Sequence, residues 1–165
     1  MFKIIFKLSN LFIFLFLFNN FSIAQTAGNL TFNFTNAKPG SNASQNVFSV
    51  WIENGNGTFV KTRCRYWGSK TNDHLPSWKS KSGQNLVDAT TGATLKSTSN
   101  PTAFGTKTIT WNGTDVNGNV VADGTYKIQV ESSWCNPEPA NNQHKFLSTF
   151  TFEKSGNAST ITPTD

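Results

Sequence analysis

Apolar and polar residues alternate in short runs along most of this chain, and that period of two restricts the fold more than any other feature. Strands that are half buried in a sheet alternate in this way because successive side chains point to opposite faces. No run keeps the 3.6-residue period of a helix over a useful length. We therefore predict an all-β fold, a single immunoglobulin-like β-sandwich of about seven strands with one long irregular loop. The runs lie at residues 30–34, 47–53, 58–66, 107–111, 125–131 and 145–153.

Turn residues separate the runs and predict how the strands connect. The stretch Asn54-Gly55-Asn56-Gly57 predicts a hairpin between the second and third runs. Asn117 and Gly118 predict a type I′ turn, which needs positive φ at both central residues. Residues 67–85 lack alternation and form the long loop, within which Pro76 to Lys81 fits a short helical turn. Loops of this length are uncommon in compact domains unless they bind something or are disordered.

The first 24 residues have the organisation of a secretory signal peptide. Lys3 and Lys7 supply the positive segment, residues 11–18 are apolar, and Ser22-Ile23-Ala24 is a small-residue cleavage site. The apolar run is shorter than the roughly 20 residues that span a bilayer. We predict three segments: a signal peptide over 1–24, a β-sandwich domain over 25–154 and a flexible tail over 155–165. The protein should be exported, periplasmic or extracellular, with no stable membrane insertion after cleavage.

The remaining charge gives little reason to expect a nucleic-acid partner. The formal net charge of +5 falls by two when Lys3 and Lys7 are removed. The other basic residues are dispersed, except for the alternating row Lys61, Arg63 and Arg65. On one face of a strand such a row is typical of a solvated surface, with an acidic partner as the alternative.

Cys64 and Cys135 are the only two cysteines. Export places them where a disulfide persists, and a bridge between them would close a long loop. Two unpaired thiols are the alternative, because the sequence gives no distance between the two residues. Their number and spacing do not fit a zinc site.

The sequence contains no strong pattern for hydrolytic catalysis or for a metal. It has neither a nucleophile elbow nor a phosphate-binding glycine loop at a strand–helix junction. The oxygen-bearing residues at 115, 117, 119 and 123 match a calcium loop only in part, and an ordinary turn is the simpler interpretation. His74 and His144 are more typical of surface histidines than of ligands. We expect no metal and no independent enzymatic activity.

One stretch, Asp88-Ala89-Thr90-Thr91-Gly92-Ala93-Thr94, has a spacing that suggests chemistry. The pattern Asp-x-x-Thr-Gly-Ala-Thr resembles the acceptor site at which ApbE-type flavin transferases attach FMN through a phosphoester bond to the last Ser or Thr. The resemblance implies covalent FMN on Thr94. Small residues at Gly92 and Ala93 keep bulk away from the acceptor. The alternative is an ordinary loop between strands in a Thr-rich chain.

The mature chain as a whole resembles an exported bacterial family of predicted periplasmic proteins, domain of unknown function 2271. The resemblance is carried by Val50-Trp51-Ile52-Glu53, Gly57-Thr58-Phe59-Val60-Lys61-Thr62, Trp67-Gly68, His74-Leu75-Pro76-Ser77-Trp78, Val87 to Thr94, Trp111-Asn112-Gly113-Thr114-Asp115 and Asp123-Gly124-Thr125-Tyr126. Residues 111–130 also resemble the immunoglobulin-like repeat related to the flagellar hook-capping protein. The chain departs from the family pattern at Arg63-Cys64-Arg65 and at Asn112.

The family resemblance implies a carrier in extracytoplasmic electron transfer, served by an ApbE-type flavin transferase and a membrane redox partner. In this hypothesis Asp88 orients the acceptor or a metal bound by the transferase, and Trp78 shields one face of the flavin. The competing hypothesis is a non-catalytic immunoglobulin-like module for binding, adhesion or structure, in which the same stretch is only surface.

Overall fold

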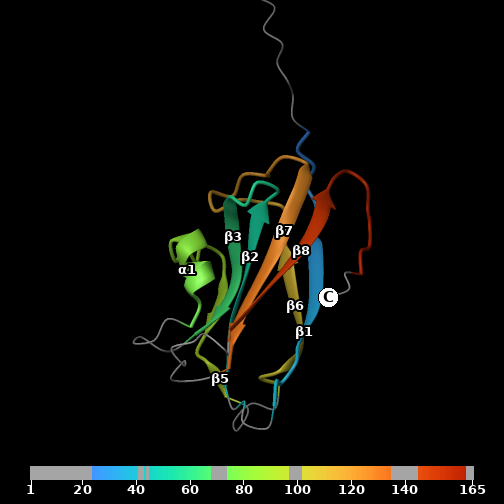
Figure 1. The fold of residues 1–165 in the computed structure, drawn as a ribbon. Helices are drawn as coiled ribbons and strands as arrows, with labels where there is room; N and C mark the ends of the chain where they lie inside the picture. Colours follow the sequence, from blue (N-terminus) through green and yellow to red (C-terminus); the bar gives the residue numbers. More distant parts are fainter. Residues whose placement is uncertain are drawn as a thin grey trace, which may run out of the picture.

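The fold is a β-sandwich of two unequal sheets, as the alternation predicts. The computed structural model describes residues 24–40, 43, 45–67, 74–96, 102–134 and 145–162. In the smaller sheet, β1 (Leu30–Asn36) pairs antiparallel with β6 (Gly105–Trp111). The larger sheet has the order β4 (Thr90–Gly92), β3 (Phe59–Tyr66), β2 (Gln45–Asn54), β7 (Gly124–Ser133) and β8 (Lys145–Lys154). The short β5 (Leu95–Lys96) pairs with the start of β2. Figure 1 shows β8 and β1 on one side of the molecule and α1 (Pro76–Ser82) on the other.

The main core lies between the two sheets and is built from the inward rows of the alternating runs. Burying these side chains supplies the largest favourable term in folding. Phe32 packs at 5.2 Å from Phe150, and Trp111 at 5.4 Å from Tyr126, between ring centroids. The fully buried members are Phe48, Val50, Ile52, Val60, Cys64, Trp111, Tyr126, Ile128 and Val130.

A second core explains why β2 is buried along almost its whole length. Val47 and Trp51 point to the opposite face of β2 and pack there against Leu75 and Trp78. The helix α1 begins at a proline, as expected, and covers this face. Its first turn is held by the buried Glu131, whose carboxylate accepts hydrogen bonds from the backbone N–H groups of Ser77 at 3.0 Å and of Trp78 at 2.7 Å. A carboxylate suits this position because the first N–H groups of a helix have no partner within the helix.

The two predicted turns are present, but one has a different geometry from the prediction. The backbone N–H of Asn54 donates to Thr58 at 2.9 Å and closes the hairpin between β2 and β3. At the second turn Gly118 has φ of 83°, whereas Asn117 is not among the described residues with positive φ. The type I′ prediction is therefore wrong. The Asp115 carboxylate decides the geometry, since it accepts the backbone N–H groups of Asn117 at 2.8 Å and Asn119 at 2.9 Å.

Asp123 ties the beginning of the described chain to the end of β8. Its carboxylate accepts hydrogen bonds from the Thr26 backbone at 3.0 Å and from the Lys154 ammonium at 2.6 Å, and its backbone N–H donates to the Ala24 carbonyl at 2.8 Å. These bonds, from Lys154 first and then Thr26, lower the pKa of Asp123 to about 2. Beyond β8, residues 155–162 contain no strand. The predicted signal peptide falls almost wholly on residues 1–23, outside the described part.

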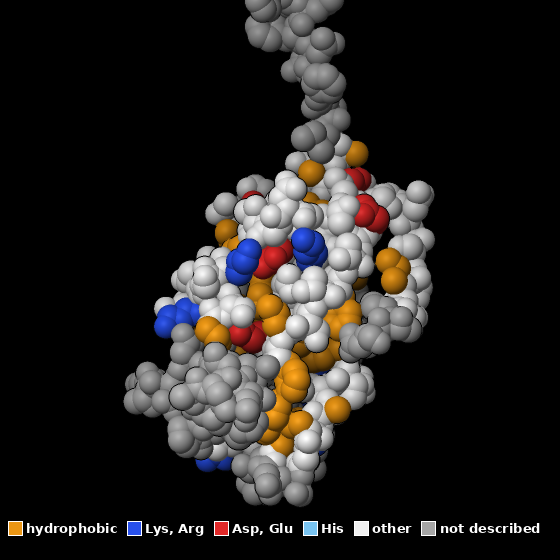
Figure 2. Space-filling model, in the orientation of Figure 1, with side chains coloured by type: hydrophobic (Ala, Val, Ile, Leu, Met, Phe, Trp, Pro, Cys, Tyr) orange, Lys and Arg blue, Asp and Glu red, His pale blue; other side chains and the backbone are white. Residues whose placement is uncertain are grey.

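No helix among the described residues is long and apolar enough to cross a bilayer. On the face of the molecule in Figure 2, lysine and arginine side chains are scattered among acidic ones. The described part of this face therefore carries no broad basic surface.

Candidate functional site

The stretch that resembles a flavin acceptor lies at the free edge of the larger sheet. Thr90, Thr91 and Gly92 form β4, which pairs in parallel with Cys64, Arg65 and Tyr66 of β3. No alternation of apolar and polar residues indicated this strand, and a loop was the expected alternative. Thr90, Thr91 and Ala93 are exposed and Thr94 is partly exposed. The edge strand thus presents small and hydroxyl-bearing residues to solvent.

Gly92 is small for a reason that the sequence did not reveal. A Cβ at this position would lie 2.8 Å from Cδ1 and Cε1 of Tyr66. The Tyr66 ring cannot move toward the core, because it stacks on the fully buried Phe48 with ring centroids 5.0 Å apart. The backbone continues the contact, since the N–H of Trp67 donates to the Gly92 carbonyl at 3.1 Å. Gly92 therefore lets β4 approach the ring of Tyr66.

Thr94 lies where the chain changes its pairing partner. Up to Gly92 the stretch runs beside β3, and from Leu95 it pairs with Asn46 of β2, past the end of β3. Ala93 and Thr94 form the step between these two pairings and belong to neither strand. A step of this kind gives the Thr94 hydroxyl a position outside the regular ladder.

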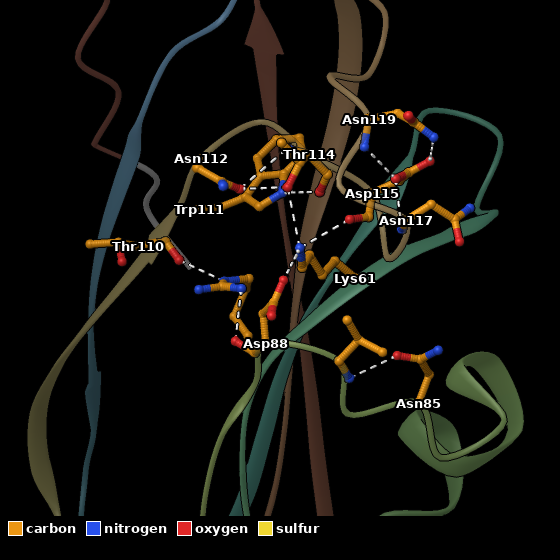
Figure 3. Close-up of polar contacts among 12 residues, drawn as sticks. Lys61, Asn85, Asp88, Thr110, Trp111, Asn112, Thr114, Asp115, Asn117 and Asn119 are labelled. Atoms are coloured by element: carbon orange, nitrogen blue, oxygen red, sulfur yellow. Dashed lines mark hydrogen bonds and ion pairs between the residues drawn. The ribbon is translucent and has the colours of Figure 1, made fainter.

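Asp88, at the other end of the stretch, is paired with a buried lysine. Asp88 adopts positive φ of 54°, a conformation that Asp tolerates better than most residues. The Lys61 Nζ donates to its Oδ2 at 2.9 Å, and also to Thr114 Oγ1 at 3.2 Å and to the Asp115 carbonyl at 3.0 Å. Figure 3 shows the ammonium group between Asp88 and the turn that contains Thr114 and Asp115. The hydrogen bond and the charge of Lys61 lower the pKa of Asp88.

The burial of Lys61 overturns the expectation that the basic row is a solvated surface. Its side chain is 1% exposed, whereas that of Asp88 is 69% exposed. The register between β2 and β3 shifts between Val50 and Trp51, so the alternation of the row is interrupted. Arg63 accordingly points elsewhere than its neighbours, and its Nε donates to the Thr110 carbonyl at 2.7 Å. The three basic residues therefore occupy three different environments.

The structure separates the two polar ends of the stretch. Asp88 contacts Lys61, near the turn at 114–119, while Thr94 lies beyond the opposite end of β4. Orientation of Thr94 by Asp88 is not apparent in this arrangement. The contact with Lys61 was missed from the sequence, where the only signal was a lysine inside an alternating strand.

Trp78 is also remote from the surface. It is a fully buried residue of α1, and its Nε1 donates to Thr62 Oγ1 of β3 at 3.0 Å. Shielding of a flavin by Trp78 would require α1 to leave the sheet.

Cys64 carries a thiol that burial makes unreactive. Desolvation raises its pKa to about 12, and the thiolate is the reactive form. In the structure Cys64 is a free thiol, and Cys135, its predicted disulfide partner, lies outside the described residues. The same holds for His144, whereas His74 is fully buried rather than on the surface.

Two features beside the stretch fit a phosphate-bearing flavin. The Arg65 Nε and Trp67 Nε1 atoms are buried and have no acceptor among the described residues. Arg65 stands opposite Thr91, and Trp67 is bonded to Gly92. Donors of this kind suit an oxygen-rich anion. Two cavities of about 460 and 500 Å³ lie elsewhere, along β1 and β8, and none of residues 88–94 lines them.

Comparison with known proteins agrees with the pattern in the sequence. A family model described as "Predicted periplasmic protein (DUF2271)" matches residues 30–159, which is more than half of the chain. No curated protein and no solved structure matches the chain significantly. The matched segment runs from the first residue of β1 past the end of β8, so it includes the whole sandwich and the edge strand β4. The chain belongs to this family of predicted periplasmic proteins, DUF2271.

Proposed function

We propose that this protein is an extracytoplasmic electron carrier to which FMN is attached through a phosphoester bond at Thr94. The observation that supports the proposal most is the position of the acceptor-like stretch on an exposed edge strand. A free strand edge offers unpaired backbone groups to another protein, which can align the stretch by adding a strand. The exposed Ala93 adds little bulk next to the hydroxyl of Thr94.

The attachment needs a donor in which FMN is held in a phosphoric anhydride, as in FAD. The Oγ–P bond to Thr94 forms while the anhydride P–O bond breaks. AMP leaves with the bridging oxygen, and the hydroxyl proton passes to a base of the transferase. No oxidant or reductant is consumed in this step.

The residues around Thr94 would hold and orient the group. Bound FMN supplies the capacity to accept and donate electrons. Gly92 keeps the backbone against Tyr66, which fixes the direction in which the chain enters the step at Ala93 and Thr94. Lys61 and Asp88 anchor the beginning of the same segment. The partners we propose are an ApbE-type transferase for loading and a membrane redox protein for electron exchange.

The test is to produce the full chain in an exporting host, with and without an ApbE-type transferase. Flavin fluorescence of the denatured protein on a gel and a mass increase of one FMN less one water report the adduct. Thr94→Ala should abolish both signals, and Thr94→Ser should retain them. Thr90→Ala is the matched control, because Thr90 lies in the same segment but at a position that the acceptor pattern leaves open, and it should load normally. Equal fluorescence in Thr94→Ala would reject the site, and no adduct with an active transferase would reject the proposal.

A second candidate function is a non-catalytic binding module. The supporting observation is the cavity of about 500 Å³ between β1 and the β7–β8 pair, lined by Phe32, Phe34, Phe146 and Phe150. Phe146 is 54% exposed, and exposed aromatic side chains are common at binding sites. A chain that never acquires flavin but loses a ligand on Phe146→Ala would favour this function over the first.

A further inference from the structure

Two residues at the end of β3 lie beside the stretch that we propose to be flavinylated. Arg65 pairs with Thr91 in the parallel register, and the Trp67 backbone bonds to Gly92. Thr94 follows Gly92 by two residues, which is about 7 Å along an extended chain. Both residues therefore border the stretch that leads to Thr94.

The two side chains are held against one another by stacking. The guanidinium carbon of Arg65 lies 6.0 Å from the ring centroid of Trp67 and 6.0 Å from that of Trp78. At this distance the rings attract the guanidinium as cation–π partners and accept no hydrogen bond in its plane, which leaves its N–H groups for an acceptor. The fully buried Trp78 makes this arrangement rigid on one side.

Each of the two residues contributes a buried donor without a described acceptor. These donors are Arg65 Nε and Trp67 Nε1, and both residues are otherwise partly exposed. Buried N–H groups are nearly always hydrogen-bonded in folded proteins. A cation and two free donors together favour an anion with several oxygen atoms.

The carboxylates of the larger sheet are committed to other partners in the described part of the chain. Asp88 binds Lys61, Glu53 accepts from Trp51 Nε1 at 2.8 Å, and Glu131 holds the first turn of α1. None of the salt bridges among the described residues involves Arg65. Its charge is therefore available to a ligand.

We propose that Arg65 and Trp67 form the subsite that binds the phosphate of the FMN attached at Thr94. This inference rests on the proposed function, because the attached flavin is what brings the phosphate to this place. Arg65 neutralises the phosphodiester charge, and Trp67 donates through its indole N–H. The subsite recognises the phosphate and not the ring.

The first experiment uses the full exported chain without transferase, so that its result does not depend on attachment. Titration with FMN, with inorganic phosphate and with riboflavin is followed through the indole N–H signals in ¹H–¹⁵N spectra. The Trp67 signal, assigned by its loss in Trp67→Phe, should move with FMN and phosphate and stay in place with riboflavin. Arg65→Gln should weaken FMN binding roughly ten- to a hundredfold, the effect of one lost charge-assisted contact. Arg65→Lys keeps the charge but not the Nε–H, so its affinity for FMN should lie between that of the unmodified chain and that of Arg65→Gln.

Arg63→Gln is the matched control, because Arg63 is two residues away on the same strand and binds the carbonyls of Thr110 and Asp88, at the end of the stretch remote from Thr94. It should bind FMN as the unmodified chain does. A folding defect in Arg65→Gln would also weaken FMN binding, so Trp67→Phe is a second test of the subsite. It removes one N–H donor and preserves an aromatic ring. Equal responses to FMN and riboflavin, or a Trp67 signal that moves with neither FMN nor phosphate, would overturn the subsite.

The second experiment compares flavin-loaded chains and separates the two proposals. Arg65→Gln should load at Thr94 but show a changed ³¹P shift of the phosphodiester and lower fluorescence anisotropy of the flavin. Normal loading with no such change would refute the subsite and leave the attachment site standing. Failure to load the unmodified chain, with a normal response of Trp67 to FMN, would refute attachment while supporting phosphate binding.

Discussion

Replacement of Gly92 by alanine tests whether this glycine serves the packing of the edge strand. The added Cβ would lie 2.8 Å from two ring carbons of Tyr66, a separation that forces a shift. Tyr66 stacks on Phe48, which is 1% exposed, so the ring cannot move into the core without disturbing it. Overpacking of this kind typically costs about 1–3 kcal/mol. For a domain of this size we expect a fall in Tm of roughly 3–10 °C.

The assay is thermal and urea unfolding of the full chain, followed by far-ultraviolet circular dichroism. Gly28→Ala is the matched control, because a Cβ there meets nothing within 4 Å, and its stability should stay near that of the unmodified chain. The same substitution is then made in a Tyr66→Val background, which removes the ring that the new methyl group meets. The cost of Gly92→Ala should nearly vanish there, as a double-mutant cycle between contacting residues requires. The reasoning would be refuted if Gly92→Ala lowered stability as much in the Tyr66→Val background as in the unmodified chain, or if it did not lower stability in the unmodified chain.

Three further predictions concern other parts of the fold. The pKa of Asp123 is lowered to about 2, so the stability that its bonds contribute should be complete above its ordinary pKa of 3.8 and be lost as the pH falls towards 2. Asp123→Asn should flatten this loss of stability at acid pH, as measured by unfolding at several pH values. An unchanged loss in Asp123→Asn would contradict the assignment. Glu131→Ala removes the acceptor for two N–H groups of α1 and should cost about 1–3 kcal/mol in urea unfolding, whereas Glu153→Ala on the exposed rim should cost less. Cys64 has a pKa raised to about 12 and should resist iodoacetamide at pH 8 in the native protein, as read by mass spectrometry of its peptide. The same label tests the disulfide, because labelling of both cysteines after denaturation without a reductant would contradict a Cys64–Cys135 bridge.

Much of the sandwich follows from the sequence because each strand has one face in the core. A period of two locates such strands directly, and β1, β2 and β7 contain the predicted runs at 30–34, 47–53 and 125–131. Pro76 likewise marks the beginning of α1. These features are encoded locally, by side-chain alternation and by the fixed φ of proline.

The candidate site was less accessible to sequence reasoning because its contacts join distant segments. The parallel pairing of β4 with β3 brings Thr91 beside Arg65, which no local pattern announces. Lys61 is buried because a register shift and an ion pair with Asp88 allow it, and neither is visible in composition. The acceptor-like spacing up to Thr94 could be recognised from the sequence, whereas the donors of Arg65 and Trp67 could be found only in three dimensions.

The hydrogen bond between Ala24 and Asp123 lies at the predicted cleavage point. Ala24 is the last residue before the predicted cleavage point, and in the folded domain its carbonyl is held by the backbone of Asp123. At the predicted cleavage point Ala24 leaves with the signal peptide, so the mature domain would lose this hydrogen bond and keep the contacts of Thr26 with the Asp123 carboxylate. Cleavage there would create a new α-amino group at Gln25, one residue before Thr26. The removal of the signal would thus supply the folded domain with an extra positive charge at the point where its two ends meet.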